Sequence, residues 1–328
     1  MLRAVIPAAG EGRRLKPHTH TTPKVLLQVA GKPIIGHIMD RLLNVNPDEV
    51  IVIVGNQGTQ IQDYLTKNYS LKFHFVEQKD PKGLGDAVGL AASFFANDTQ
   101  PSQVLILLGD TIVDINLKEI LGKENYIGTK TVDDPRRFGV VETKNGYVTK
   151  IVEKPVEPKS NLAIIGLYYF SEARPLFENI EKIIRKDRKT RGEYQLSDAL
   201  EEMVESGIKI KTYPVEYWLD CGTPDALIAT NRYLLQATHY YKPRERVVII
   251  PPVCIDDSVS IEESVIGPFV SIGEGAEIRN SIIRDSIINQ RAYVENCLLE
   301  SSILSESAII RARAHHVNLG AFSELELG

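Results

Sequence analysis

A loop near the start of the chain carries residue types that bind phosphate. Gly10 and Gly12 come directly after an apolar run, Arg3–Ala8, which predicts a strand. Arg14 and Lys24 follow in the same loop. Successive backbone N–H groups of a glycine-rich loop can surround phosphate oxygens, and an arginine adds a permanently charged fork of matching geometry. The pattern indicates a polyphosphate held by backbone amides and by two converging cations.

The spacing of this loop differs from that of the two common phosphate loops. A Walker loop ends in Gly-Lys-Ser or Gly-Lys-Thr, which is absent here. A Rossmann dinucleotide loop needs a third glycine where Arg14 or Leu15 stands. By itself, a Gly-x-Gly after a strand is equally compatible with an ordinary tight turn between a strand and a helix.

A candidate metal ligand follows another apolar run. The run Val104–Leu108 predicts a strand, and Gly109 and Asp110 come directly after it. A carboxylate at the C-terminal end of a parallel strand points into the ligand crevice of an open sheet. Mg²⁺ prefers one or two carboxylates together with phosphate oxygens and water. Asp110 is therefore a candidate Mg²⁺ ligand, although an aspartate at this place is also typical of a turn or a helix cap.

The elements that must position these residues follow a regular alternation. The first roughly 240 residues alternate short apolar runs with amphipathic segments of helical length, which is typical of an α/β domain whose mostly parallel, Rossmann-like sheet is covered on both faces. The predicted strands are Arg3–Ala8, Val50–Val54, Leu71–Val76, Val104–Leu108, Phe138–Glu142, Val148–Glu153 and Ala163–Phe170. The predicted helices are Pro33–Leu43, Gln57–Lys67, Gly83–Phe95, Ala173–Ile184, Leu196–Ser206 and Pro224–Tyr240.

After residue 240 the period of the apolar residues changes. Aligned with steps of 17, 16 and 16 residues, the chain gives four columns: Ile255, Ile272, Ile288, Leu304; Ile261, Ile278, Val294, Ile310; Val265, Ile282, Leu298, Ala314; and Val259, Ala276, Ala292, Ala308. Aliphatic positions about six apart are typical of hexapeptide coils, which stack because no coil buries its apolar edge alone. The sequence therefore predicts two domains, residues 1–240 and a left-handed parallel β-helix over residues 241–328.

Composition and charge exclude several classes of protein. Lys and Arg total 38 against 43 Asp and Glu, a net charge of −5, which argues against nucleic acid as a partner. No apolar run approaches the roughly 20 residues of a membrane span, and no signal-peptide pattern precedes the first strand, so we expect a cytoplasmic protein. Cys221, Cys254 and Cys297 lack Cys-x-x-Cys spacing, so we expect reduced thiols.

Taken together, the motifs from Ala8 to Pro33 resemble the opening of the sugar-phosphate nucleotidylyltransferases, also called nucleotide-sugar pyrophosphorylases. That family opens with Gly-x-Gly-Thr/Ser-Arg-Leu-x-Pro, then Pro-Lys and Lys-Pro, and the counterparts here are Gly10–Pro17, Lys24 and Lys32. The later motifs are most similar to the glucose-1-phosphate thymidylyltransferase branch in its long form with a C-terminal β-helix. Arg13 departs from the pattern, where a small hydroxyl residue is usual. The change either weakens NTP binding or supplies a third cation.

The resemblance implies roles for individual residues. Nucleotide binding falls on Ala8, Ala9, Gly10, Gly12, Arg13, Gln78 and Gly83, and catalysis on Arg14, Lys24 and Lys154. Sugar binding falls on Gly139, Glu153, Lys154, Ile164 and Tyr168, with Glu193 and Asp198 framing the pocket, and Mg²⁺ binding on Asp110 and Asp220. Tyr168 is equally compatible with a place in the core. Gln78 is expected to recognise the base, because its amide can donate to O4 and accept from N3–H of thymine or uracil. Gly85 and Asp86 depart slightly from the family's usual pattern.

The implied reaction is Mg²⁺-dependent transfer of a nucleotidyl group from an NTP, first of all dTTP, to a sugar 1-phosphate, first of all glucose 1-phosphate. Its products are an NDP-sugar and pyrophosphate. The alternatives are a UTP–glucose-1-phosphate uridylyltransferase or another sugar specificity, a bifunctional nucleotidyl- and acyltransferase that uses His315 and His316, and a non-catalytic regulatory paralogue. A metal site at His18 and His20 lacks a third ligand in the sequence nearby. We also expect a homo-oligomer, with the β-helix as a possible assembly surface.

Overall fold

The computed structural model describes residues 1–312 of the chain. Its internal contacts divide the chain into two compact units. The first unit comprises Met1–Leu27 and Lys32–Leu227, and the second comprises Gln28–Gly31 and the residues from Ile228 onward. The expected division between residues 240 and 241 therefore moves to residue 227, inside helix α6 (Pro224–Ala237).

Asn231 on α6 gives the physical reason for this shift. Its side-chain oxygen accepts a hydrogen bond from the Ala30 N–H (2.8 Å), and its side-chain nitrogen donates to the Phe269 carbonyl (3.2 Å). Arg232, the next residue, pairs with Asp285. The C-terminal part of α6 is therefore bonded into the second unit.

The first unit is built on one nine-stranded sheet in the order β5-β4-β1-β6-β11-β8-β12-β10-β9. Its first four strands run parallel, as the sequence predicts: β5 (Phe73–Glu77), β4 (Glu49–Val54), β1 (Leu2–Ala8) and β6 (Gln103–Leu107). Every residue of β4 is buried, which is typical of a parallel strand covered on both faces. The carboxyl ends of these strands meet at one edge of the sheet.

The remaining strands make the sheet mixed. They are β8 (Asn125–Thr131), β9 (Gly139–Lys144), β10 (Tyr147–Glu153), β11 (Leu162–Phe170) and β12 (Ile210–Pro214). β11 runs antiparallel to both β6 and β8, and β9 forms an antiparallel hairpin with β10. The hairpin turn holds Asn145 and Gly146 at φ values of 54° and 79°, the backbone that an Asn-Gly turn supplies between antiparallel strands.

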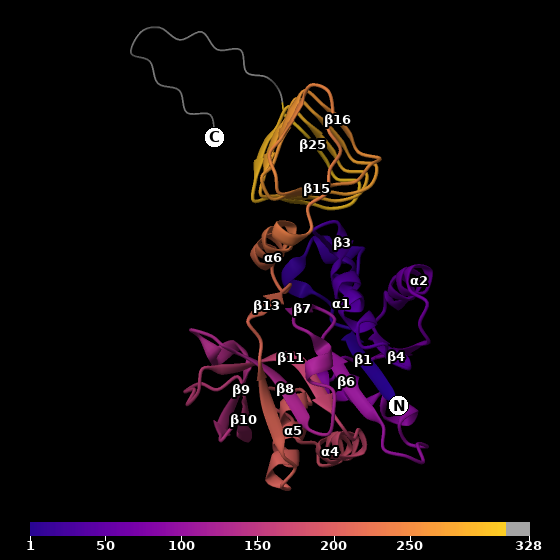
Figure 1. Ribbon diagram of the computed structural model, residues 1–328, viewed down its shortest axis with the longest axis vertical. Helices are drawn as coiled ribbons and strands as arrows, with labels where there is room; N and C mark the ends of the chain where they lie inside the picture. The colour runs from indigo at the N-terminus through magenta and orange to yellow at the C-terminus, as the bar shows by residue number, and fades with distance from the viewer. Residues whose placement is uncertain (313–328) are drawn as a thin grey trace. The chain divides into compact units, whose positions relative to one another are not determined.

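Six α-helices occur within residues 1–312: α1 (Ile34–Leu43), α2 (Gly58–Asn68), α3 (Leu84–Gly89), α4 (Arg174–Arg185), α5 (Leu196–Glu205) and α6. α4 and α5 pack against each other (Figure 1). The helix predicted over Gly83–Phe95 is interrupted, because α3 ends at Gly89 and a separate 3₁₀ turn follows at Ala92–Phe94. A Cβ at Gly89 would lie 3.0 Å from the Ile180 Cγ2 of α4. The glycine that weakens the helix thus allows the close approach of α4.

Short elements complete the first unit. β7 (Thr111–Asp114) pairs with β13 (Tyr217–Asp220), and β3 (Lys32–Pro33) is a further short strand of this unit, whereas β2 (Gln28–Val29) belongs to the second unit. The remaining 3₁₀ turns are Arg13–Leu15, His18–His20, Lys24–Leu26, Leu117–Glu119 and Pro135–Arg137. No helix in the described part of the chain has both the length and the apolar character to cross a membrane.

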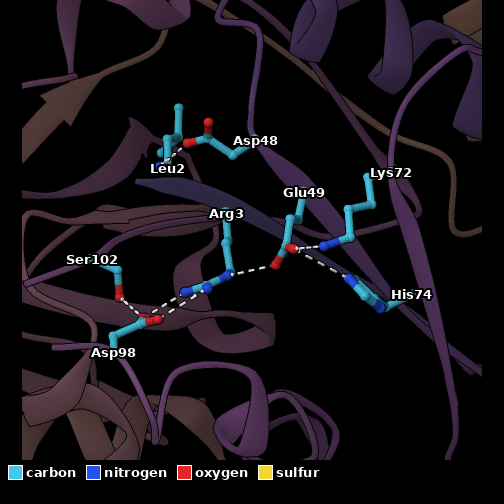
Figure 2. Close-up of polar contacts among 8 residues, drawn as sticks. All are labelled: Leu2, Arg3, Asp48, Glu49, Lys72, His74, Asp98 and Ser102. Atoms are coloured by element: carbon cyan, nitrogen blue, oxygen red, sulfur yellow. Dashed lines mark hydrogen bonds and ion pairs between the residues drawn. The ribbon is translucent and has the colours of Figure 1, made fainter. Parts of the chain in front are cut away.

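A buried ion cluster ties together the amino ends of the parallel strands (Figure 2). Arg3 on β1 is 6% exposed and donates to Glu49 of β4 at 2.7 Å and to both carboxylate oxygens of Asp98 at 2.5 and 3.0 Å. Lys72 also donates to Glu49. The hydrogen bonds from Lys72 and Arg3 lower the pKa of Glu49 to about 2. Arg3 lies on β1, Glu49 lies on β4, and Lys72 directly precedes β5. The cluster therefore joins the amino ends of these three neighbouring strands.

The second unit contains three four-stranded parallel sheets that form the sides of stacked coils (Figure 1). The first sheet consists of β14 (Val247–Ile249), β17 (Ser264–Ile266), β20 (Ile282–Arg284) and β23 (Leu298–Glu300). The second consists of β15 (Val253–Ile255), β18 (Val270–Ile272), β21 (Ile287–Ile288) and β24 (Ile303–Leu304). The third consists of β16 (Ser260–Glu262), β19 (Glu277–Arg279), β22 (Tyr293–Glu295) and β25 (Ile309–Arg311). This arrangement confirms the predicted parallel β-helix.

The strand register follows the columns read from the sequence. Ile255, Ile272, Ile288 and Leu304 pair in succession along the second sheet, and Ile261, Ile278, Val294 and Ile310 along the third. Of the predicted small column, Val259, Ala276 and Ala292 are buried, and Ala308 is half-buried.

The third predicted column pairs in register but faces outward. Ile282 is 38% exposed and Leu298 is 73% exposed, whereas their neighbours Ile283 and Leu299 are 0% and 9% exposed. Side chains alternate between the two faces of a strand, so two adjacent aliphatic residues cannot both enter the core. The inner column on the first sheet is therefore Ile266, Ile283 and Leu299. Ala314, the last member of the predicted column, lies outside the described residues.

Candidate active site

Three adjoining cavities lie at the carboxyl ends of the parallel strands. We call the first the loop cavity (about 250 Å³), because the residues after β1 line it. The wide cavity (about 600 Å³) is lined by residues of β9, β10, β11 and β13 and by the loops between the strands and helices. Leu84, Leu108, Asp110 and Glu193 line both, so the two form one continuous cleft. A third cavity of about 280 Å³ shares Gln78 and the residues after β1 with the loop cavity.

The loop after β1 forms one wall of the loop cavity. No atom lies within 4 Å of the place where a Cβ of Gly10 would stand, so this backbone faces open space. Ala8 and Ala9 line the same cavity. Gly12 has a structural role in the loop, because its φ is +63° and a Cβ there would lie 2.8 Å from the Thr19 Cγ2. Gly12 thus shapes the loop but lines none of the three cavities.

The two adjacent arginines of the loop lie in different surroundings. Arg14 lines the wide cavity. Arg13 instead pairs with Glu11, Nε to Oε2 at 2.6 Å, and both of these side chains are more than half exposed. Arg13 lines none of the three cavities. The idea that Arg13 adds a third cation to the site gains no support from this placement.

A lysine and two carboxylates meet where the cavities join. Lys24 is 8% exposed, and its Nζ lies 2.5 Å from the Asp110 Oδ2. Asp220 ends β13, which pairs antiparallel with β7 so that Asp220 stands opposite Thr111. The Cys221 N–H donates to the Asp110 carbonyl at 3.1 Å. This ladder brings together two aspartates that lie 110 positions apart in the sequence, and both line the wide cavity.

The charged groups of this junction act on one another. Burial, and then the negative charge of Asp110, raise the pKa of Asp220, while Lys24 and Arg14 act in the opposite direction. A Cβ at Gly222 would lie 2.8 Å from the Arg14 Nη2 and 2.9 Å from the Asp220 Oδ1, so both groups crowd this glycine. Two carboxylates that line the same open cavity fit a hard divalent cation whose other ligands are phosphate and water.

The donor set also limits which metal fits. Within residues 1–312, no group of three or more His, Cys, Asp or Glu side chains is placed to hold a metal ion. A structural zinc site takes four protein ligands and a catalytic one takes three. Mg²⁺ needs only one or two carboxylates, so the two aspartates fit Mg²⁺ and do not fit zinc.

The wide cavity holds the residues to which the resemblance assigns the sugar: Gly139, Glu153, Lys154, Ile164 and Tyr168. Glu153 accepts a hydrogen bond from the Ser197 hydroxyl at 2.8 Å, and the Lys154 Nζ lies 3.2 Å from its Oε1. Tyr168 is 5% exposed, and burial together with the charge of Glu153 raises the pKa of its phenol. Tyr168 is therefore a wall of the cavity and a member of the core at once.

Gln78 and Gly83 line the loop cavity. The Gln78 Nε2 donates to the Asp86 Oδ2 at 2.8 Å and, more weakly, to the Gly83 carbonyl at 3.4 Å. Gly83 has φ +118°, and a Cβ there would lie 2.5 Å from the Tyr194 carbonyl oxygen. The Gly85 N–H donates to the same oxygen at 2.8 Å. The two glycines therefore let the segment after β5 lie against the segment before α5.

Sequence reasoning missed several residues of the wide cavity. They include Arg136, Arg137, Arg191, Gln195, Ser197 and Trp218. The sequence does carry a signal for two of these arginines. Arg137 directly precedes Phe138-Gly139-Val140, and Arg191 directly precedes Gly192-Glu193. Arg191 donates to the Lys154 carbonyl at 2.8 Å and thus supports a predicted site residue.

Other candidates lie elsewhere. Glu193 lines both the loop and the wide cavity, but Asp198 lines neither; it is 8% exposed and accepts a hydrogen bond from Thr190 at 3.0 Å. His20 lines the third cavity, and burial lowers the pKa of His18. His315 and His316, the candidates for acyl transfer, lie outside the described residues.

Comparison with known proteins gives a consistent picture. The model of the family described as nucleotidyl transferase matches residues 3–237. The low-salt glycan biosynthesis nucleotidyltransferase Agl11 of Haloferax volcanii is 31% identical over 91% of this chain and 92% of its own length. A glucose-1-phosphate thymidylyltransferase of Streptomyces antibioticus is 27% identical over 99% of both chains. The bifunctional protein GlmU of Methanococcus vannielii is 34% identical over 91% of this chain and 78% of its own length.

Two solved structures share the fold of most of the chain. A candidate glucose-1-phosphate thymidylyltransferase of Bacillus anthracis, in complex with sucrose, superimposes with a TM-score of 0.62 at 27% identity, over 74% of this chain and 98% of its own. A UDP-glucose pyrophosphorylase in complex with UDP-glucose gives a TM-score of 0.61 at 23% identity, over 72% and 99% of the two chains. At this identity the second similarity concerns the fold alone.

Proposed function

This chain belongs to the nucleotidyl transferase family, as its motifs predict, and we propose that it joins a pyrimidine nucleoside triphosphate to a sugar 1-phosphate. The products are an NDP-sugar and pyrophosphate. One observation carries the proposal: Lys24, Asp110 and Asp220 meet where a cavity lined by a glycine-rich loop opens into a cavity lined by hydroxyl-binding groups. Such a junction suits a phosphoryl group that passes between two substrates.

We assign the nucleotide to the loop cavity. The open backbone at Gly10 suits phosphate oxygens. Lys24 lines this cavity and Arg14 lines the adjoining wide cavity, so the two cations stand on either side of the junction that the triphosphate would enter. Gln78 suits the base edge of uracil or thymine. The thymidylyltransferase among the relatives favours dTTP as the first choice, and UTP is the alternative.

We assign the sugar 1-phosphate to the wide cavity. The carboxylate of Glu153 can accept hydrogen bonds from sugar hydroxyls, and the ammonium of Lys154 next to it can hold the sugar phosphate. Glucose 1-phosphate is the first choice, on the ground that the related thymidylyltransferase is named for it.

In the proposed reaction, a phosphate oxygen of the sugar attacks the α-phosphorus of the NTP in line. The bond from that phosphorus to the bridging oxygen breaks, and pyrophosphate leaves with the electron pair. A phosphate monoester is already largely dianionic at neutral pH, so no general base is required. Positioning and charge neutralisation then supply the catalysis. Lys154 orients the attacking phosphate, while Arg14 and Lys24 stabilise the charge on the triphosphate and the leaving pyrophosphate.

We further propose that Asp110 and Asp220 hold Mg²⁺. The metal would neutralise charge on the α-phosphate. The pair fits it because two coupled carboxylates beside open cavity space leave the remaining positions to phosphate and water.

The first experiment mixes the protein with Mg²⁺, glucose 1-phosphate and each of dTTP, UTP, GTP and ATP in turn, and measures pyrophosphate release. We expect release with dTTP or UTP and none with the purine nucleotides. Omitting the sugar phosphate controls for plain NTP hydrolysis, and EDTA controls for the metal. Release with a purine nucleotide alone would contradict the base assignment. Silence with every NTP and with a panel of other sugar 1-phosphates would contradict the proposed function and favour the non-catalytic alternative.

A further inference from the structure

The amide of Gln78 is held in one of its two possible orientations. The groups that face its nitrogen are the Asp86 carboxylate (2.8 Å) and the Gly83 carbonyl (3.4 Å). Both are acceptors, and a carboxylate cannot donate. Turning the amide by 180° would set its oxygen against these two acceptors and lose the hydrogen bond to Asp86. The bond is charge-assisted and partly buried, which makes its loss costly.

This orientation leaves the amide oxygen of Gln78 for the ligand. The side chain is 8% exposed, and it lines both the loop cavity and the third cavity. Among residues 1–312, no group donates a hydrogen bond to the Gln78 Oε1. This atom is also absent from the buried polar atoms that lack a partner, so it is accessible to solvent. The exposed part of Gln78 therefore offers an acceptor to whatever binds in the loop cavity.

Asp86 is itself fixed by the fold. It lies in the first turn of α3, directly after Gly85, whose N–H donates to the Tyr194 carbonyl at 2.8 Å. A Cβ at Gly85 would lie 2.9 Å from that oxygen, so only glycine allows this contact. No ion pair involves Asp86 in the part of the chain that the structure describes. The backbone contacts of this segment thus fix the position of the Asp86 carboxylate, which accepts the hydrogen bond from Gln78.

We propose that Asp86 is a positioning residue that makes the site select uracil or thymine over cytosine, by locking the Gln78 amide with its oxygen toward the base. This inference rests on the proposed function and names the residue behind its base preference. Uracil and thymine present an N3–H donor, which the amide oxygen accepts. Cytosine presents an unprotonated N3 acceptor at the same position. To bind cytosine, Gln78 would have to present its amide N–H to this N3. That requires a 180° rotation of the amide, which the hydrogen bond to Asp86 opposes.

The test compares UTP with CTP, which share the ribose and the ring size. Asp86→Asn keeps the shape of the side chain, but its amide can donate as well as accept, so both orientations of Gln78 become available. We expect the ratio of kcat/KM for UTP to that for CTP to fall about tenfold, the effect of one hydrogen bond. The KM for the sugar 1-phosphate should stay within about twofold of the wild-type value. Glu178→Gln is the matched control, because Glu178 and Asp86 line the same groove of about 540 Å³ on the other side of α3.

A double variant tests the lock directly. In Gln78→Glu with Asp86→Asn, the carboxylate at position 78 can only accept, so the face toward the base is an acceptor again while the net charge of the pair is unchanged. We expect the UTP preference to recover relative to Asp86→Asn alone. An equal loss of kcat/KM for both nucleotides in Asp86→Asn, without recovery in the double variant, would show a merely structural role and overturn the inference.

Binding measurements separate this inference from the proposed function. Calorimetry gives the dissociation constants of UTP and CTP for the wild-type protein and for Asp86→Asn, without a sugar substrate. Tighter binding of UTP by the wild type, with a reduced difference in the variant, would support the lock even if no pyrophosphate were released. Equal dissociation constants for the two nucleotides in the wild-type protein would overturn it, whatever the activity.

Discussion

The Lys24 Nζ lies 2.5 Å from the Asp110 Oδ2, so a buried lysine and a candidate metal ligand form one ion pair where the loop cavity meets the wide cavity. The Lys24 side chain is 9% exposed and that of Asp110 is 36% exposed, so removing Asp110 leaves a buried ammonium without its counterpart, whereas removing Lys24 leaves a half-buried carboxylate. Substitutions at Lys24 and Asp110 are therefore coupled, and their effects on turnover should not add.

The first prediction concerns the carboxylate of this pair. Asp110→Asn is expected to lower turnover by at least about 10², because it removes a charge that would stabilise the transition state through the proposed Mg²⁺. Pyrophosphate release at saturating substrates measures it. Asp257→Asn is the matched control, since Asp257 is an exposed aspartate of the second unit that pairs with Lys242. Near-wild-type turnover in Asp110→Asn would remove Asp110 from the proposed mechanism.

The second prediction separates the two adjacent arginines. Arg14→Ala is expected to lower turnover by at least about 10², because Arg14 lines the cavity at the junction with Asp220. Arg13→Ala is expected to lower it by less than about fivefold, because an exposed ion pair such as that of Arg13 with Glu11 contributes little. The same pyrophosphate assay measures both variants. The reverse order of effects would mean that Arg13 rather than Arg14 meets the polyphosphate.

Local patterns were sufficient to predict the parallel strands and the coils of the β-helix. The strand Arg3–Ala8 and the columns that begin at Ile255 and Ile261 rest on periodicity, which the chain carries within a few residues. The outward column at Ile282 shows where this signal ends. Two aliphatic residues stand side by side there, and periodicity alone cannot tell which one enters the core.

The site depends on pairings that are remote in sequence. Asp220 meets Asp110 only because β13 pairs with β7, and neither short strand has a pattern that predicts the pairing. The resemblance to a family supplied Asp220, whereas residue types alone left it undetermined. Asp86 was visible only as a departure from the family pattern. Its hydrogen bond to Gln78 requires the turn at Gly83, which places two residues eight positions apart against each other.

The third prediction tests which aliphatic column forms the core of the β-helix. Ile283 is fully buried, so Ile283→Ala is expected to lower the free energy of unfolding by about 2–5 kcal/mol through lost burial and a cavity. Leu298 is 73% exposed, so Leu298→Ala is expected to change it by less than about 0.5 kcal/mol. Urea denaturation of the full chain, followed by circular dichroism, measures both variants. Equal destabilisation would contradict the outward orientation of Leu298.

The fourth prediction concerns the ion cluster at the amino ends of the parallel strands. Glu49→Gln removes the negative charge between Lys72 and Arg3. Because Lys72 is 64% exposed and the buried Arg3 keeps Asp98 as a partner, we expect a loss of about 1.5–3 kcal/mol at pH 7, the range for hydrogen bonds to charged groups. The folded chain holds the pKa of Glu49 at about 2, below its ordinary value of 4.5. The unfolded chain therefore binds a proton to Glu49 more readily than the folded chain does. The stabilisation by Glu49 is present above about pH 4.5 and is lost as the pH falls toward 2.

The difference in stability between the wild type and Glu49→Gln should accordingly shrink as the pH is lowered from 7 to 3. Urea denaturation at pH 7, 5, 4 and 3 measures this difference, and comparing the two proteins cancels the titration of carboxylates outside the cluster, such as Glu124. A constant difference across this range would mean that Glu49 has an ordinary pKa in the folded chain. The hydrogen bonds from Lys72 and Arg3 would then contribute packing rather than charge stabilisation.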